Sequence, residues 1–188
     1  MTAVRIAHVE PWPGKRMSGR GFGISSFLVV LVDDSGRALP VWLNGPEGHG
    51  LWRGDDHPHP HPHPEPAEVI SAELLRTAGV AVTGVDIDEL EAALTTGPRR
   101  GRDGPGPSAR IQFTAAGTAE PRQMKARIGY VLALAAATGA PIRVADQVMD
   151  RLAVPAQDDL LSQFTRGVPL PPKRHGFARL FRAHPRAA

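Results

Sequence analysis

Glu47 and His49 are the first pair of side chains in this sequence that could do chemistry together. They follow the apolar segment 41–43 and the chain-breaking residues 44–46. A carboxylate and an imidazole two residues apart could share a divalent metal ion, or one of them could accept a proton from a nucleophile. The alternative is structural, because Pro46 suits the first turn of a helix, where Glu47 would be a favourable acid and His49 a surface residue.

Four His-Pro repeats at residues 57–64 form the most conspicuous candidate metal site. They lie in an insertion, residues 55–66, that should be a polyproline-type loop, and their imidazoles belong to His57, His59, His61 and His63. In a polyproline helix only the first and last of these share a face, roughly 19 Å apart, whereas a transition metal holds its ligands at about 2 Å. The sequence therefore favours a solvated insertion, with weak divalent metal binding as the alternative.

Basic residues in a glycine-rich loop and in the C-terminal tail are the candidates for contact with phosphate. The loop is residues 97–108 and the tail is residues 156–188. The candidates are Arg99, Arg100, Arg102, Lys173, Arg174, Arg179 and Arg182. Residues 166–188 contribute +6 to a net charge of +3, so the rest of the chain is slightly acidic. These residues could bind nucleic acid, and the tail could instead hold a protein partner; a solvated loop and tail are the simpler alternative.

Asp146 and Asp150 are a third candidate metal site, because they lie one helical turn apart and paired carboxylates can hold magnesium. A simpler interpretation is that Asp146 is the N-cap of a helix and Asp150 an acid of its first turn.

Composition excludes several classes of protein. The chain of 188 residues has no cysteine, which excludes disulfides, a thiolate nucleophile and cysteine-bound zinc, and fits a reducing compartment. The longest apolar run, residues 131–137, is too short to cross a membrane. Phosphate-binding glycine loops and serine-centred nucleophile motifs are not found. We therefore expect a cytoplasmic protein without a membrane partner.

Periodicity predicts the elements that must position these residues. Strands are expected at 3–9, 25–32, 37–43, 80–87, 109–115 and 142–144, and helices at about 67–78, from 121 or 122 to 138, and after Asp146. The continuous apolar run of the second strand suggests burial on both of its faces. We expect one α+β domain at residues 1–155, with a mixed, mostly antiparallel sheet, about three packed helices and a flexible basic tail.

Two blocks of sequence resemble the bifunctional nuclease domain. Residues 38–47 (ALPVWLNGPE) are similar to the family's Leu-Pro-Ile-Trp-Ile-Gly strand and the start of the helix that follows it. Residues 137–153 (ATGAPIRVADQVMDRLA), about a hundred positions later, are similar to the end of a family helix that leads into Pro-Ile-Val. The resemblance covers roughly residues 3–155 and is that of a divergent bacterial member.

The resemblance implies hydrolysis of phosphodiester bonds in DNA or RNA, assisted by a divalent metal such as magnesium or manganese. The family's polar Asp-Ala-Arg-Pro-Ser-Asp run corresponds to residues 125–130, where Ala126 and Arg127 match and the two acids are replaced by Lys125 and Tyr130. The family's Thr-His-Asp run corresponds to residues 66–71, where only Glu68 offers a carboxylate.

The candidate catalytic residues are therefore Glu47, His49, Glu68, Lys125 and Arg127. The two cations, expected on the first turns of the long helix, could stabilise charge on the phosphate, and the base would have to come from one of the other three or from a more distant acid. The alternative for Arg127 is a structural ion pair. A rival hypothesis is a catalytically inactive module that binds nucleic acid or protein, and a third is a histidine-rich metal-responsive protein. An exposed sheet edge would also permit a homodimer.

Overall fold

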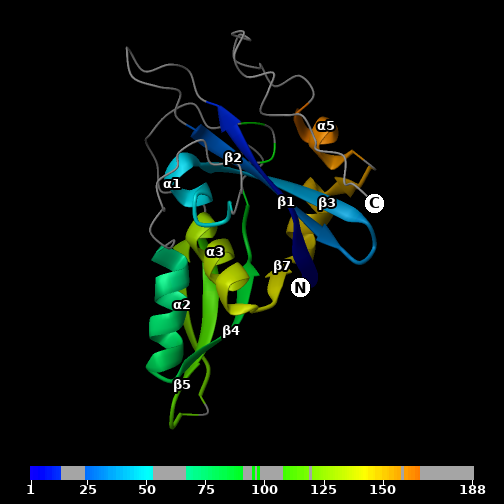
Figure 1. Cartoon of the computed structure of the whole chain (residues 1–188). Coiled ribbons are helices and arrows are strands. Elements are labelled where there is room, and N and C mark those ends of the chain that lie inside the picture. Colours follow the sequence, from blue (N-terminus) through cyan, green and yellow to red (C-terminus); the bar gives the residue numbers. More distant parts are fainter. Residues whose placement is uncertain are drawn as a thin grey trace, which may run out of the picture.

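The computed structural model of the protein describes residues 1–13, 24–52, 67–90, 95, 97, 108–118, 120–157 and 159–165. Within these residues eight strands form one sheet in the order β6-β5-β4-β7-β1-β2-β3-β8 (Figure 1). The strands are β1 Thr2–Pro13, β2 Ile24–Asp33, β3 Arg37–Asn44, β4 Val80–Ile87, β5 Ser108–Ala115, β6 Arg122–Arg127, β7 Ile142–Val144 and β8 Val154–Pro155. The helices are α1 Gly45–Gly48, α2 Ala67–Thr77, α3 Ile128–Thr138, α4 Asp146–Leu152 and α5 Leu160–Thr165.

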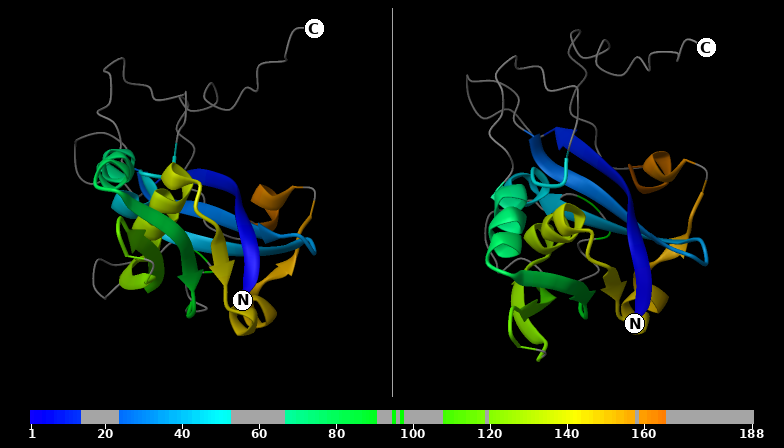
Figure 2. Two further views of the ribbon diagram at one scale, coloured as in Figure 1. Left: turned by 90° about the horizontal axis from the view of Figure 1, so that it is seen from below. Right: turned by 60° about the horizontal axis from the view of Figure 1, so that its bottom comes forward.

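Neighbouring strands are antiparallel except for β4 and β7, which run parallel. Three of the described helices, α2, α3 and α4, have seven residues or more, and α2 lies beside α3 (Figure 2). The predicted α+β domain with a mixed, mostly antiparallel sheet is therefore confirmed. The whole His-Pro insertion at 55–66, most of the loop at 97–108 and the tail from residue 166 lie outside the described residues.

Strand β2 is buried on both faces, as its continuous apolar run predicts. Phe27, Val29 and Leu31 belong to the larger core, which includes the buried face of α3. Leu28 and Val30 point to the other face, in a smaller cluster with two tryptophans and a phenylalanine of α5. Burying each such side chain contributes about 1.5–3 kcal/mol, so the β1-β2-β3 unit is a rigid base for the elements that follow β3.

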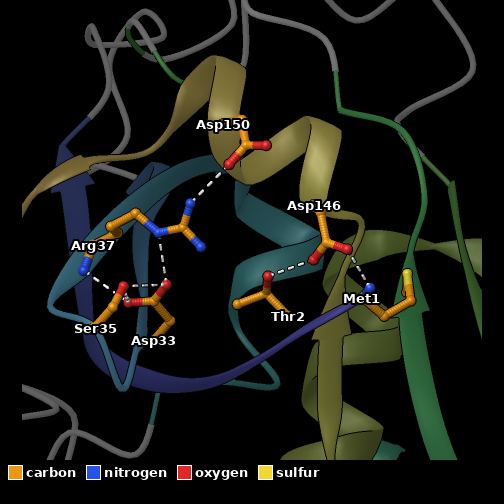
Figure 3. Close-up of polar contacts among 7 residues, drawn as sticks. All are labelled: Met1, Thr2, Asp33, Ser35, Arg37, Asp146 and Asp150. Carbon is orange, nitrogen blue, oxygen red and sulfur yellow. Dashed lines mark hydrogen bonds and ion pairs between the residues drawn. The ribbon is translucent and has the colours of Figure 1, made fainter.

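The β2–β3 hairpin closes at Gly36, whose φ of +79° is the left-handed conformation that glycine adopts readily. The side chain of Asp33 is 3% exposed and accepts hydrogen bonds from the Ser35 hydroxyl and from the backbone N–H and Nε of Arg37. Burial alone would raise the pKa of Asp33, but these bonds and the guanidinium charge lower it to about 2. Arg37 also donates to Asp150 of α4, which connects the hairpin to that helix (Figure 3).

The first strand is longer than the predicted segment 3–9, because β1 continues through Pro11. It pairs with β2 as far as Pro13. On its other side β1 pairs with β7 only at Thr2–Val4. Among the described residues, the later part of β1 is therefore an edge, the position in a sheet where proline is tolerated.

The long helix predicted from residue 121 or 122 is wrong in its first half. Residues 122–127 form the edge strand β6, which pairs with β5 in register from Phe113↔Arg122 to Ser108↔Arg127. The helix α3 begins only at Ile128, and it ends, as predicted, before Gly139. Lys125 and Arg127 thus belong to a strand and to the N-cap position, and not to the first turns of a helix.

Candidate functional site

Glu47 and Arg127 form the centre of the candidate site. Glu47 lies in the single turn of α1, where its N–H donates to Asn44 Oδ1 at 3.2 Å. Its carboxylate is buried, with the residue 3% exposed, and Oε1 lies 3.3 Å from Nη1 of Arg127. Arg127 stands where β6 turns into α3, and its side chain is 55% exposed. The ion pair joins two segments that are 80 residues apart in sequence.

Three glycines let α1 approach its neighbours this closely. A methyl group at Gly48 would lie 2.1 Å from the ring of Phe27, and one at Gly129 would lie 2.5 Å from Cβ of Glu47. A methyl group at Gly50 would lie 2.4 Å from Oε2 of Glu68. Gly48 weakens a helix by propensity but is required by its packing against Phe27, whereas at Gly50 only the end of the Glu68 side chain would have to move. This was the signal that sequence reasoning overlooked.

His49 and Glu68 border the same turn. The ring of His49 is exposed and makes an edge-on contact with Phe27, with the ring centres 5.2 Å apart. Glu68 is half-buried in the first turn of α2, and the contact with Gly50 places its carboxylate beside the residue that follows His49. Four of the five predicted catalytic residues thus gather around α1. We call Glu47, His49, Glu68 and Arg127 the α1 cluster.

Lys125 is not part of the α1 cluster. It pairs with Arg110 across β5, and Arg110 pairs with Asp86 of β4. Since paired residues share a face of a sheet, Lys125 points to the face opposite α2 and α3. Its neighbour Met124 shares the helix-covered face with the buried Ile111.

The described residues do not supply a metal centre. No three histidine, aspartate or glutamate side chains among them come close enough together to hold an ion, and the α1 cluster is included in that statement. The predicted metal residues His57, His59, His61 and His63 lie outside the described part of the chain. The described residues therefore do not fit the divalent ion that the resemblance implies.

Asp146 and Asp150 have structural partners. Asp146 accepts hydrogen bonds from the Met1 amino group and the Thr2 hydroxyl, both at 2.7 Å, and these bonds lower the pKa of Asp146 (Figure 3). The predicted N-cap role is wrong, because Ala145 is the N-cap and Asp146 is the first helical residue. The carboxylate turns instead to β1, and Asp150 pairs with Arg37, so the two acids hold separate elements onto α4.

A second polar group, which sequence reasoning did not find, lies on the face of the sheet opposite the helices. Asp86 is 5% exposed and accepts hydrogen bonds from Nε of Arg143 and from the amide of Gln112. Nearby, Arg110 pairs with Asp88. The hydrogen bonds to Asp86 come from β5 and β7, and the guanidinium of Arg143 balances the charge of this buried carboxylate.

The remaining predicted phosphate contacts, Arg99, Arg100, Arg102, Lys173, Arg174, Arg179 and Arg182, lie outside the described residues. An open apolar hollow of about 350 Å³ lies between β3, β8, α4 and α5, with Pro40, Leu152 and Phe164 in its wall. None of the α1 cluster lines this hollow. In the described part of the chain no helix is long and apolar enough to span a membrane.

Comparison of the chain with models of known protein families and with curated proteins gave no match.

Proposed function

We propose that this protein hydrolyses phosphodiester bonds in DNA or RNA, as its resemblance to the bifunctional nuclease domain implies. The observation that supports this function is the α1 cluster. Arg127 is the residue that matches the family's polar run, and it meets Glu47, which follows the family-like strand. The half-buried Glu68 and the exposed His49 stand beside the same turn.

In this proposal, the exposure and the ion pair of each residue determine its role. The exposed guanidinium of Arg127 contacts the phosphate and stabilises the negative charge that develops on it. Glu47 is a positioning residue, because its carboxylate is buried and already binds Arg127. Proton transfer falls to His49 and Glu68, whose side chains reach solvent. Of the three residues predicted as alternative sources of the base, this proposal therefore assigns proton transfer to His49 and Glu68 and not to Glu47.

The test is cleavage of labelled single- and double-stranded DNA and RNA with magnesium, manganese, zinc or EDTA. Arg127→Ala, His49→Ala and Glu68→Gln should each lower the rate by about 100-fold or more. Arg122→Ala, which removes a cation at the other end of β6, is the matched control and should cleave like the wild type. Equal rates in all variants would place the site elsewhere, and a folded wild-type protein that cleaves none of the four substrates would refute the proposal.

A second candidate function is binding of nucleic acid without cleavage. The same ion pair favours this function, because Glu47 and Arg127 hold α1 onto α3. In a protein that only binds nucleic acid, the two residues would be needed for the stability of the fold and not for catalysis. It is also favoured by Lys125 and Tyr130, which stand where the family has acids. Binding in the cleavage assay without product, in the presence of every metal tried, would support this function.

A further inference from the structure

Strand β6 presents a row of polar side chains at the edge of the sheet. Because alternate residues of a strand share a face, Gln123 and Lys125 point to the side opposite the helices. Arg127 ends the row, at the point where the strand turns toward α1. Gln123 and Lys125 are exposed. Three of the six residues of β6 are cations and none is an acid.

The row has the spacing of a phosphate backbone. Residues two apart on a strand are separated by roughly 6.6–6.8 Å, which is close to the separation of successive phosphates in an extended nucleotide strand. On the neighbouring strand β5, Arg110 adds a third cation beside Lys125, although it also pairs with Asp88. The row leads to the α1 cluster, because its last member, Arg127, is the residue that contacts Glu47.

We propose that Gln123, Lys125 and Arg127 form a track for single-stranded nucleic acid, which it holds by its phosphates and delivers to the α1 cluster. This inference rests on the proposed action on nucleic acid and names its substrate class. A straight row matches an extended strand, whereas the phosphates of a duplex wind away from it along each groove. Contacts with phosphate carry no base information, so binding along the track is independent of sequence.

Charge favours single-stranded nucleic acid over a second copy of the chain as the partner of β6. Because directly paired residues share a face of the sheet, two β6 strands paired antiparallel about Lys125 would place the two Lys125 side chains opposite each other. Like charges directly opposite each other destabilise a strand pair. The polyanionic backbone of a single strand meets the same cations favourably.

The experiment is fluorescence anisotropy with a phosphorothioate single-stranded oligonucleotide and its duplex, in EDTA, at several salt concentrations. Lys125→Gln removes one positive charge from the track, and Arg122→Gln removes one from the opposite face of the same strand. Lys125→Gln should weaken single-strand binding about fivefold to tenfold at low salt and reduce the salt slope by about 0.7, whereas Arg122→Gln should change affinity less than twofold.

A second pair of variants tests which face of β6 binds the single strand. Gln123→Glu and Met124→Glu each add one negative charge, at adjacent residues on opposite faces of β6. Met124 is 53% exposed, so a glutamate there can remain solvated. Only Gln123→Glu should weaken binding of the single strand, and both variants should keep the wild-type urea midpoint.

The outcomes separate this inference from the proposed hydrolysis. Single-strand binding that depends on Lys125, in a protein that cleaves nothing, supports the track and refutes the hydrolysis. Cleavage with equal binding by Lys125→Gln and Arg122→Gln refutes the track and leaves the hydrolysis standing. Tighter binding of the duplex, or a Lys125-dependent preference for an acidic peptide over the oligonucleotide, also overturns the track.

Discussion

Gly129→Ala tests the packing that builds the α1 cluster, because two known effects act on it in opposite directions. Alanine stabilises the interior of a helix by about 1 kcal/mol relative to glycine, and this gain is an upper bound at Gly129 because it is the second residue of α3. Here the added methyl group would lie 2.5 Å from Cβ and 2.8 Å from the backbone oxygen of Glu47, and a backbone atom cannot move aside alone. Overpacking of this kind costs about 1–3 kcal/mol and occasionally more. We expect the clash to exceed the gain, so that the free energy of unfolding falls by about 1–2 kcal/mol.

The measurement is urea unfolding of the wild type and of Gly129→Ala, with free energies taken from the midpoint and the slope. Glu47→Gly removes the nearer of the two clashing atoms, so the double variant should show a favourable coupling of about 0.5 kcal/mol or more. Gly97→Ala is the control, because a methyl group at Gly97 meets no atom within 4 Å. A Gly129→Ala protein as stable as the wild type, or more stable, would refute the proposed contact between α1 and α3.

Three other variants test the buried charges. Asp33→Asn should lower the free energy of unfolding at pH 7 by about 2 kcal/mol. Folding lowers the pKa of Asp33 from 3.8 to about 2, so the wild type should lose this stability as the pH falls from about 4 to 2. Urea titrations from pH 7 to pH 2 check this, and parallel curves for the two proteins would contradict it. Arg127→Ala should destabilise the fold by about 1–3 kcal/mol, and by more than Glu47→Gln, because alanine leaves a buried carboxylate without its cation whereas glutamine removes the buried charge. Thermal unfolding of both variants decides the order. Arg143→Ala should cost about 2 kcal/mol for the same reason, and Asp86→Asn combined with it should recover part of the loss, which a double-mutant cycle measures.

The parts of the fold that depend on local sequence were predictable. The apolar run of β2 indicated burial on both faces, and residues 33–36 carried the composition of a tight turn. Gly139 marked the end of α3, because its φ of +71° is a conformation that other residues rarely adopt. In each case the deciding interaction lies within a few residues of the signal.

Strand β6 could not be predicted in this way. Gln, Met, Lys, Ala and Arg all favour helices, and residues 122–127 consist of these types alone. Pairing with β5 supplies a hydrogen-bonded partner that propensity does not contain, and the tertiary contact prevails. The alternation of Met124 and Ala126 with polar residues was the available sign of a strand, although six residues are too few to separate it from a helix.

The candidate site was predictable as a set of residues and unpredictable as an arrangement. The resemblance selected Glu47 and Arg127, but no local pattern shows that residues 80 apart are in contact. Lys125 was assigned to the same site because it was expected on a helix, and the period of a strand places it on the other face. Asp86, between two apolar residues, had the pattern of a solvent-facing position, and Arg143 and Gln112 cover it only in the folded sheet.

The position of β1 has a consequence for the order in which the chain can fold. The β1-β2-β3 unit is synthesised before α3, which covers one of its faces and begins about a hundred residues after the start of β2. At 5–20 residues per second, that face stays uncovered for roughly 5–20 s of synthesis. Strand β7, the neighbour of β1 that links the two halves of the sheet, arrives later still. The nascent protein therefore carries an apolar surface and an unpaired strand edge until its second half emerges, and its yield in a cell should depend on what shields them during that interval.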